Sequence, residues 1–234
     1  MFNLNVFIMK RLCLLCIIAA LLCSCQSKET KAVKLIEQHL FGTLFDFDSY
    51  TPIETVLTEA KSSALNDSTI YSKIQMAIIL IERLADSKKE VERIKSQMEI
   101  WGPPTRHSSS YAKQQYKKYE TQASEALADV LTYSFDLWQL DEHLKDAIHT
   151  LDENTIVGWE AIHRFRCKTI GGYSTIGEYR YIIDKEFKNI ILCEDLNDDN
   201  HNLAREIVDV LLMENQSNEE KIDLLDLASK TSTK

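Results

Sequence analysis

Apolar residues recur at steps of three and four along two long stretches of the chain, which is the period of an amphipathic helix. The first stretch covers residues 69–101, and a helix of this length spans roughly 45 Å. The second covers about residues 111–151. Pro103 and Pro104 stand between them and end the first helix, because proline lacks the backbone N–H that continues the hydrogen-bond ladder. The pattern therefore predicts a long antiparallel helical hairpin.

Shorter helices are expected before this hairpin. Residues 31–41 carry an apolar stripe, and Gly42 is a plausible end for that helix. Thr51 and Pro52 have the order of a helix cap followed by a proline in the first turn. The stripe of this second short helix would be Ile53, Val56, Leu57 and Ala60. Residues 31–151 are thus predicted to form one helical region.

At about Thr155 the apolar period changes from 3.6 to 2, which indicates the start of a β-region. Strands are expected over residues 159–168, 179–183 and 190–193, and a helix over 203–213. The fold class is therefore α+β, with a long helical hairpin and shorter helices packed on a three-stranded antiparallel β-meander. The meander and its helix occupy residues 155–213, and residues 214–234 form a polar tail.

The N-terminal residues 1–24 have the parts of an export signal. Lys10 and Arg11 precede an apolar stretch of about a dozen residues that is too short to span a membrane. The stretch ends in Leu22-Cys23-Ser24-Cys25, which resembles the lipobox of bacterial lipoproteins. That resemblance implies cleavage before Cys25 and lipidation of Cys25, with residues 25–30 as a short tether. The alternative is ordinary signal cleavage beside a coincidental cysteine.

A second stretch carries a resemblance of its own. Gly158-Trp159, His163-Arg164-Phe165-Arg166, Gly171-Gly172, Tyr181 and residues 184–190 are similar to a pattern in small uncharacterised lipoproteins of Bacteroidota. This resemblance covers about a fifth of the chain and implies location, not chemistry. The expected location is the bacterial cell envelope, with the protein held at the outer membrane by its lipid anchor.

Charge and cysteine content narrow the candidate functions. After removal of the signal peptide, 25 basic residues face 36 acidic ones, a net charge of −11, so neither a nucleic acid nor an anionic lipid is expected as a partner. Cys167 and Cys193 are then the two remaining thiols besides Cys25. Because disulfides form in exported proteins, these two cysteines are expected to pair, between strands or with a neighbouring molecule.

The acidic segment 195–206 is the first candidate for chemistry. It places Asp195, Asn197, Asp199 and Glu206 at positions 1, 3, 5 and 12 of an EF-hand-like loop, a spacing that can wrap Ca²⁺. Against this, Asn200 stands where an EF-hand has glycine, and a strand precedes the loop. The alternative is a solvated acidic segment that caps the following helix.

Histidine and arginine residues offer weaker candidates. His143, Asp146 and His149 follow one another at steps of three, but the two histidines lie about 240° apart around a helix and converge poorly on one metal ion. His163 is expected to be a hydrogen-bonded core residue. Three arginines of the strands could form an anion-binding patch or a cross-strand ladder with Glu160 and Glu178; the three are Arg164, Arg166 and Arg180.

Two functional hypotheses follow from these patterns. The preferred one is a lipid-anchored envelope protein without catalytic activity that presents a binding or scaffolding surface to a protein or glycan partner. The other is a small envelope enzyme or a Ca²⁺-dependent binder that uses residues 195–206.

Overall fold

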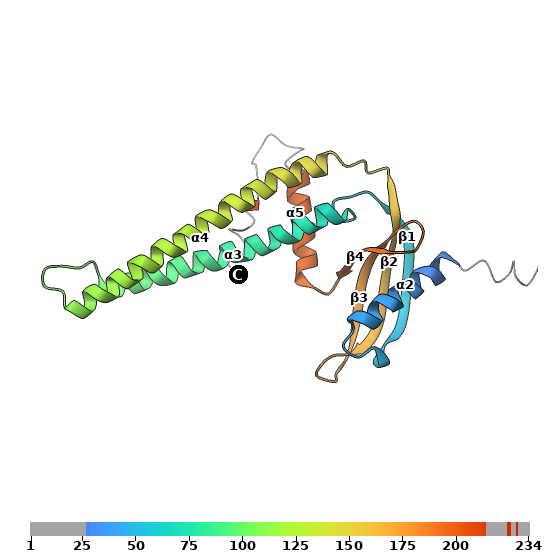
Figure 1. Ribbon diagram of the computed structural model, residues 1–234, viewed down its shortest axis with the longest axis horizontal. Helices are drawn as coiled ribbons and strands as arrows, with labels where there is room; N and C mark the ends of the chain where they lie inside the picture. The colour runs from blue at the N-terminus through green and yellow to red at the C-terminus, as the bar shows by residue number, and fades with distance from the viewer. Residues whose placement is uncertain (1–26, 214–223, 226–227, 229–234) are drawn as a thin grey trace, which may run out of the picture. The chain divides into compact units, whose positions relative to one another are not determined.

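Two long helices form where the apolar spacing predicts them. The computed structural model describes residues 27–213, 224–225 and 228, and in it α3 (Ser68–Trp101) and α4 (Ser110–His149) lie side by side as an antiparallel hairpin (Figure 1). Gly102 ends α3 at a φ of +62°, and Pro103 and Pro104 follow it. The hairpin prediction is confirmed.

Polar side chains fix where both hairpin helices begin. The Asp67 carboxylate accepts hydrogen bonds from the backbone N–H groups of Thr69 and Ile70, both at 2.9 Å. Ser109 accepts from the N–H of Ala112 at 3.1 Å. These bonds satisfy N–H groups that have no partner within the helix, which defines its first turn.

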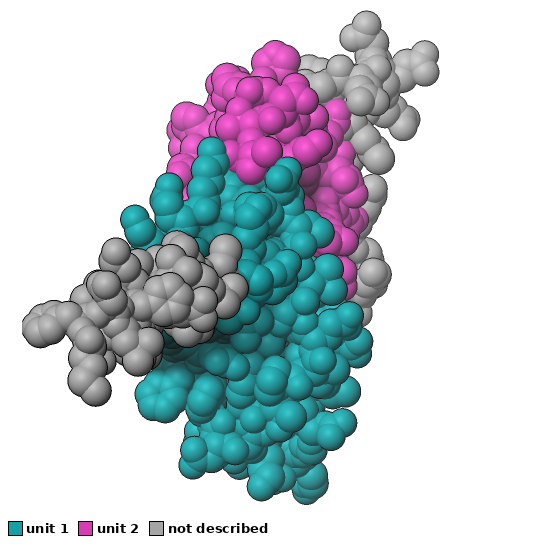
Figure 2. All heavy atoms as spheres, turned by 90° about the vertical axis from the view of Figure 1, so that its right-hand side faces the viewer, with its two compact units in different colours: residues 1–60, 157–195 teal, residues 61–156, 196–234 magenta. Residues whose placement is uncertain are grey.

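The chain divides into two units that alternate along the sequence (Figure 2). Unit 1 comprises residues 1–60 and 157–195, and unit 2 comprises residues 61–156 and 196–234. The hairpin belongs to unit 2, together with α5 (Asp199–Met213). Its core is formed by apolar residues that recur at helical spacing on the three helices, among them Ile74, Ile78, Ile81, Leu84, Leu137, Leu144, Ile207 and Leu211.

Unit 1 is built on a four-stranded sheet, not on the predicted three-stranded meander. The strands are β1 (Thr51–Lys61), β2 (Ile156–Lys168), β3 (Ser174–Ile183) and β4 (Ile190–Asp195), and they lie in this order in the sheet. The predicted strands 159–168, 179–183 and 190–193 all fall within β2, β3 and β4, which pair antiparallel.

The helix predicted from Thr51 onward is wrong, because these residues form the edge strand β1. Five of its eleven residues are β-branched, which favours an extended backbone, and their apolar spacing also matches a helix by coincidence. Pro52 fits this strand because an edge strand leaves N–H positions unpaired.

One helix covers one face of this sheet (Figure 1). α2 (Lys28–Thr43) is capped by Ser27, whose hydroxyl accepts from the N–H of Thr30, so the helix starts inside the predicted 25–30 tether. A single 3₁₀ turn, η1 (Phe47–Ser49), then leads into β1. The unit 1 core consists of Ala32, Ile36 and Leu40 from α2 against Ala161, Phe165, Tyr181 and Ile183 from the sheet.

Two glycines of β2 and β3 allow close approach within this sheet. A Cβ atom on Gly158 would clash with the backbone carbonyl of Ile183, and one on Gly177 would lie 2.6 Å from the ring of Phe165. No helix among the described residues has the length and apolarity required to cross a membrane.

Candidate functional site

The predicted lipidation residue and its signal peptide lie outside the described residues. Cys25 precedes the first described residue, Ser27, by two positions. Most of the predicted polar tail also lies outside, although Leu224 and Ala228 are described and belong to the unit 2 core. Lipidation of Cys25 therefore stays a prediction from the sequence.

The acidic segment 195–206 does not adopt the EF-hand loop conformation. Asp195 is the last residue of β4, Asn197 lies in the turn that follows, and α5 already begins at Asp199. Glu206 lies seven residues into α5, about 10.5 Å along the helix axis from Asp199. Within the described part of the chain, no group of three or more His, Cys, Asp or Glu side chains is placed to hold a metal ion, and this covers His143, Asp146 and His149 as well.

The start of α5 has the geometry of the alternative interpretation, in which the acidic segment caps the following helix. The Asp198 carboxylate accepts a hydrogen bond from the N–H of Asn200 at 3.0 Å, as a capping side chain does. The acidic residues here stabilise the beginning of a helix.

Cys167 and Cys193 are free thiols, so the predicted pairing between strands is not formed. Cys167 pairs in register with Thr175, whereas Cys193 pairs with Tyr181. The two cysteines are thus separated by the whole of β3 and are displaced by six residues along it, about 20 Å. A disulfide needs Cα atoms within about 7 Å.

His163 is a core residue, as its place on the alternating strand predicts. It is fully buried on β2, and its two ring nitrogens hydrogen-bond the hydroxyls of Tyr50 at 3.0 Å and Thr55 at 2.8 Å. Burial lowers the pKa of His163. Burial, with a smaller effect of Glu37, raises the pKa of Tyr50 to about 12, so its hydroxyl stays protonated. Both polar groups of the imidazole are therefore satisfied inside the core.

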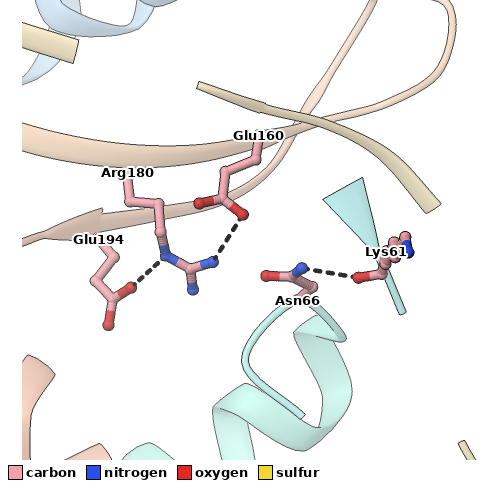
Figure 3. Close-up of polar contacts among 5 residues, drawn as sticks. All are labelled: Lys61, Asn66, Glu160, Arg180 and Glu194. Atoms are coloured by element: carbon pink, nitrogen blue, oxygen red, sulfur yellow. Dashed lines mark hydrogen bonds and ion pairs between the residues drawn. The ribbon is translucent and has the colours of Figure 1, made fainter. Parts of the chain in front are cut away.

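Two of the three strand arginines, Arg164 and Arg180, form cross-strand ion pairs, and Figure 3 shows those of Arg180. Arg180 lies between two carboxylates, at 2.8 Å from Glu194 and 3.9 Å from Glu160, and Arg164 lies 3.8 Å from Glu178. Arg180 is only 4% exposed. A buried arginine held between two carboxylates is a structural ion pair, because its charge is already compensated.

A cationic hollow in unit 1 was not foreseen from the sequence. Lys31 and Lys34 of α2 line it together with Lys188 and Phe187 of the β3–β4 turn, and its volume is about 260 Å³. Beside it, Phe187 stacks on Trp159 with ring centroids 5.6 Å apart. We call these five residues the lysine–aromatic cluster. The spacing of lysines in α2 is visible in the sequence, but the meeting of three separate segments is not.

An apolar strip lies along α4 in unit 2, where exposed side chains recur at steps of four, four and three. The exposed fractions are 49% for Leu127, 72% for Leu131, 55% for Phe135 and 50% for Trp138. Leu127 also lines a groove of about 380 Å³ between α3 and α4, whose other lining residues are Val91, Lys95, Met98, Glu99, Pro103, Tyr116 and Ala123. We call Leu127, Leu131, Phe135 and Trp138 the α4 strip.

Comparison of the chain with protein-family models, with curated proteins and with solved structures gives no match.

Proposed function

We propose that this chain is a lipid-anchored protein of the bacterial cell envelope, held at the outer membrane through Cys25, that works by binding or scaffolding and not by catalysis. The N-terminal support is the lipobox-like ending Leu22-Cys23-Ser24-Cys25 after a cationic and apolar segment. Several acyl chains on one cysteine give stable membrane attachment, because each buried methylene contributes about 0.8 kcal/mol.

The observation that carries the binding role is the α4 strip. Four large apolar side chains that stay about half exposed or more on one line of a helix are unusual on a solvated surface and are typical of a surface that meets a partner. Their spacing matches the anchors of helix-in-groove recognition, and the adjoining groove between α3 and α4 is apolar. The partner that fits such a strip is a protein with an apolar helix face, in preference to a glycan.

The anchor is tested by mass spectrometry of the N-terminal peptide of the protein isolated from the producing cell. We expect a peptide that begins at Cys25 and carries a diacylglyceryl thioether and an amide-linked acyl chain. A peptide with unmodified Cys25, or one that begins at Met1 or Met9, would overturn the anchor. A Cys25→Ser chain serves as the control and should be lost from the membrane fraction.

The strip is tested by site-specific photo-crosslinking in intact cells. A photoreactive side chain at Leu131 should give a defined adduct, whereas the same side chain at Asp129 should not, because Asp129 is also exposed but lies about 160° around α4 from Leu131. The adduct mass distinguishes a second copy from a different envelope protein. Equal crosslinking at the two positions, or none at Leu131, would contradict the binding role.

A further inference from the structure

We propose that the lysine–aromatic cluster binds the phosphate of an anionic phospholipid headgroup in the membrane to which the chain is anchored. The inference rests on the proposed function in one respect, because the anchor places the cluster at a bilayer. The residues of the cluster all belong to unit 1.

The geometry of the hollow suits a phosphate group. Lys31, Lys34 and Gln38 lie at steps of three and four on one face of α2, and the β3–β4 turn closes the other side with Lys188. All four side chains are exposed, so their polar ends are open to a ligand from solvent. Ammonium and amide N–H groups are the donors that recognise phosphate oxygens.

Among the described residues, three lysines and no carboxylate line the hollow. None of Lys31, Lys34 and Lys188 forms an ion pair with the residues that the structure describes. The nearby Asp184 carboxylate accepts from the N–H of Lys188 at 2.7 Å and from the Asn189 side chain at 2.8 Å, and these neutral donors leave its negative charge in place. The three lysines of the hollow outnumber this one carboxylate, so positive charge is locally in excess although the whole chain has a net charge of −9. The expectation against an anionic lipid rests on net charge and does not describe this local distribution.

The turn that completes the hollow is held in an uncommon conformation. Phe187 has a φ of +58°, which is rare for a residue with a bulky side chain. This backbone, closed by a 3.1 Å bond from the N–H of Phe187 to the carbonyl of Asp184, places the Phe187 ring flat against Trp159 with 19° between the planes. Strain of this kind persists where the surrounding structure maintains it and often coincides with a ligand site.

The aromatic side of the cluster favours a membrane surface over a soluble anion. Lys28 places its ammonium 3.9 Å from the centroid of the Trp159 ring. Tryptophan beside lysine is the residue combination found at the headgroup level of bilayers, where an aromatic ring meets the interface and an ammonium meets phosphate. Lysines close to an anionic leaflet also add to the affinity of a lipid anchor.

The position of the cluster in the chain gives it access to such a surface. Lys28 is the third residue after Cys25 and the first residue of α2. Three residues span at most about 11 Å, so a lipidated Cys25 keeps the start of α2 within that distance of its own backbone position at the bilayer. An anionic headgroup is therefore the phosphate source nearest to Lys31 and Lys34.

The test measures lysine reactivity on vesicles. The protein isolated from the producing cell is mixed with vesicles of phosphatidylcholine, or of phosphatidylcholine with 30% phosphatidylglycerol, and is acetylated briefly with an amine-reactive ester. We expect Lys31, Lys34 and Lys188 to react at least threefold more slowly on the anionic vesicles. Lys168 is the internal control, because it lies nine residues along β2 from Trp159, about 30 Å away, and its rate should not change.

Three outcomes would overturn the proposal. Equal rates on both vesicle types would show that the lysines do not meet anionic headgroups. Slow acetylation of the three lysines already on vesicles of pure phosphatidylcholine would show that the anchor covers the cluster whatever the charge of the lipid. Equal protection by soluble glycerol 1-phosphate without vesicles would identify a site for a free phosphate.

The protein is digested to measure lysine acetylation, and the same digest tests the anchor independently of the headgroup site. It contains the N-terminal peptide, so the modification of Cys25 is measured in the same sample. An unmodified Cys25 with selective protection of the three lysines supports the headgroup site and removes the anchor. A lipidated Cys25 with no selective protection removes the headgroup site and leaves the anchor.

Discussion

At the scale of single residues, a neutral His163 is part of the unit 1 core. Its ring nitrogens are satisfied by Tyr50 and Thr55, and its ring stacks on Phe165. Because burial lowers the pKa of His163 relative to the unfolded chain, the unfolded state binds more protons near pH 6. We expect the free energy of unfolding to be highest above about pH 6.5 and to fall as the pH drops from there toward the folded-state pKa of His163.

The measurement is urea unfolding at a series of pH values between 5 and 8. His163→Gln keeps a hydrogen-bonding side chain but cannot gain the proton, so its stability should depend less steeply on pH below 6.5. Burial also lowers the pKa of His39, which adds a slope of the same sign and leaves part of the pH dependence in the variant. An unchanged slope in His163→Gln would contradict this role for His163.

The two cysteines lead to a second prediction at this scale. Burial raises the pKa of Cys193 to about 11 and also raises that of Cys167, so both thiols are mostly protonated at pH 8. We expect slow maleimide labelling of both in the folded protein, and complete labelling in 8 M urea without added reductant. A requirement for reductant before the unfolded chain can be labelled would show that the two cysteines are bridged after all.

The cysteines also show which features of the sheet could not be predicted from the sequence. Alternation along the strands correctly placed His163, Phe165 and Cys167 on the buried face of β2. Whether Cys167 can reach Cys193, however, depends on the order of strands and on their register, which are properties of the whole sheet. A local pattern contains neither.

At the scale of elements, α3 and α4 were predictable and β1 was not. The hairpin helices combine a regular apolar spacing over their whole length with side-chain caps at Asp67 and Ser109 and prolines after α3. β1 is an edge strand with a single fully buried residue, Ala60, so it lacks the strict alternation that identifies a half-buried strand. Its conformation is decided by pairing with β2, which begins at Ile156, 95 residues after β1 ends at Lys61. A local sequence pattern does not contain a contact over that separation.

The close approach at Gly158 is a property of the sheet that one substitution can test. Gly158→Ala would push a methyl group into the backbone carbonyl of Ile183, the register partner of Trp159. We expect a loss of roughly 1–3 kcal/mol or more in the free energy of unfolding, measured by urea denaturation. Gly42→Ala is the matched control, because nothing lies within 4 Å of its added Cβ and it sits in α2. That control should be neutral or up to about 1 kcal/mol more stable, and a comparable loss in both would contradict the argument.

The start of α3 provides an independent test of helix capping. Asp67→Ala removes the acceptor for two backbone N–H groups, and we expect a loss of about 1 kcal/mol in stability. Asp67→Asn keeps an acceptor oxygen and should restore most of that loss. If Asp67→Asn is as unstable as Asp67→Ala in thermal unfolding, the hydrogen bonds do not account for the effect.

At the scale of the whole molecule, the candidate sites arise from segments that the sequence keeps apart. The lysine–aromatic cluster joins α2, β2 and the β3–β4 turn, so that Lys31 and Lys188 meet across more than 150 positions. The α4 strip, in contrast, lies within one helix, but the apolar period that predicts this helix does not separate exposed positions from buried ones. Only the packing of α4 against α3 shows that Leu137 and Leu144 are buried while Leu131 is not.

The alternation of the two units along the chain leads to the last prediction. Each unit has its own core, with Leu84 fully buried in unit 2 and Phe165 buried in unit 1. Trp159 reports on unit 1, and Trp138 reports on unit 2. Separate cores allow a substitution to act first on its own unit, because a cavity weakens the contacts that surround it.

We expect Leu84→Ala to cost about 2–5 kcal/mol and to lower the urea midpoint seen by Trp138 more than that seen by Trp159. The measurement uses two chains that keep one reporter each, with the other two tryptophans changed to phenylalanine. Gly158→Ala is the reciprocal control and should shift the Trp159 transition more. Coincident transitions that move together in both variants would mean that the units unfold as one cooperative body, because two-state unfolding gives the same midpoint with every probe.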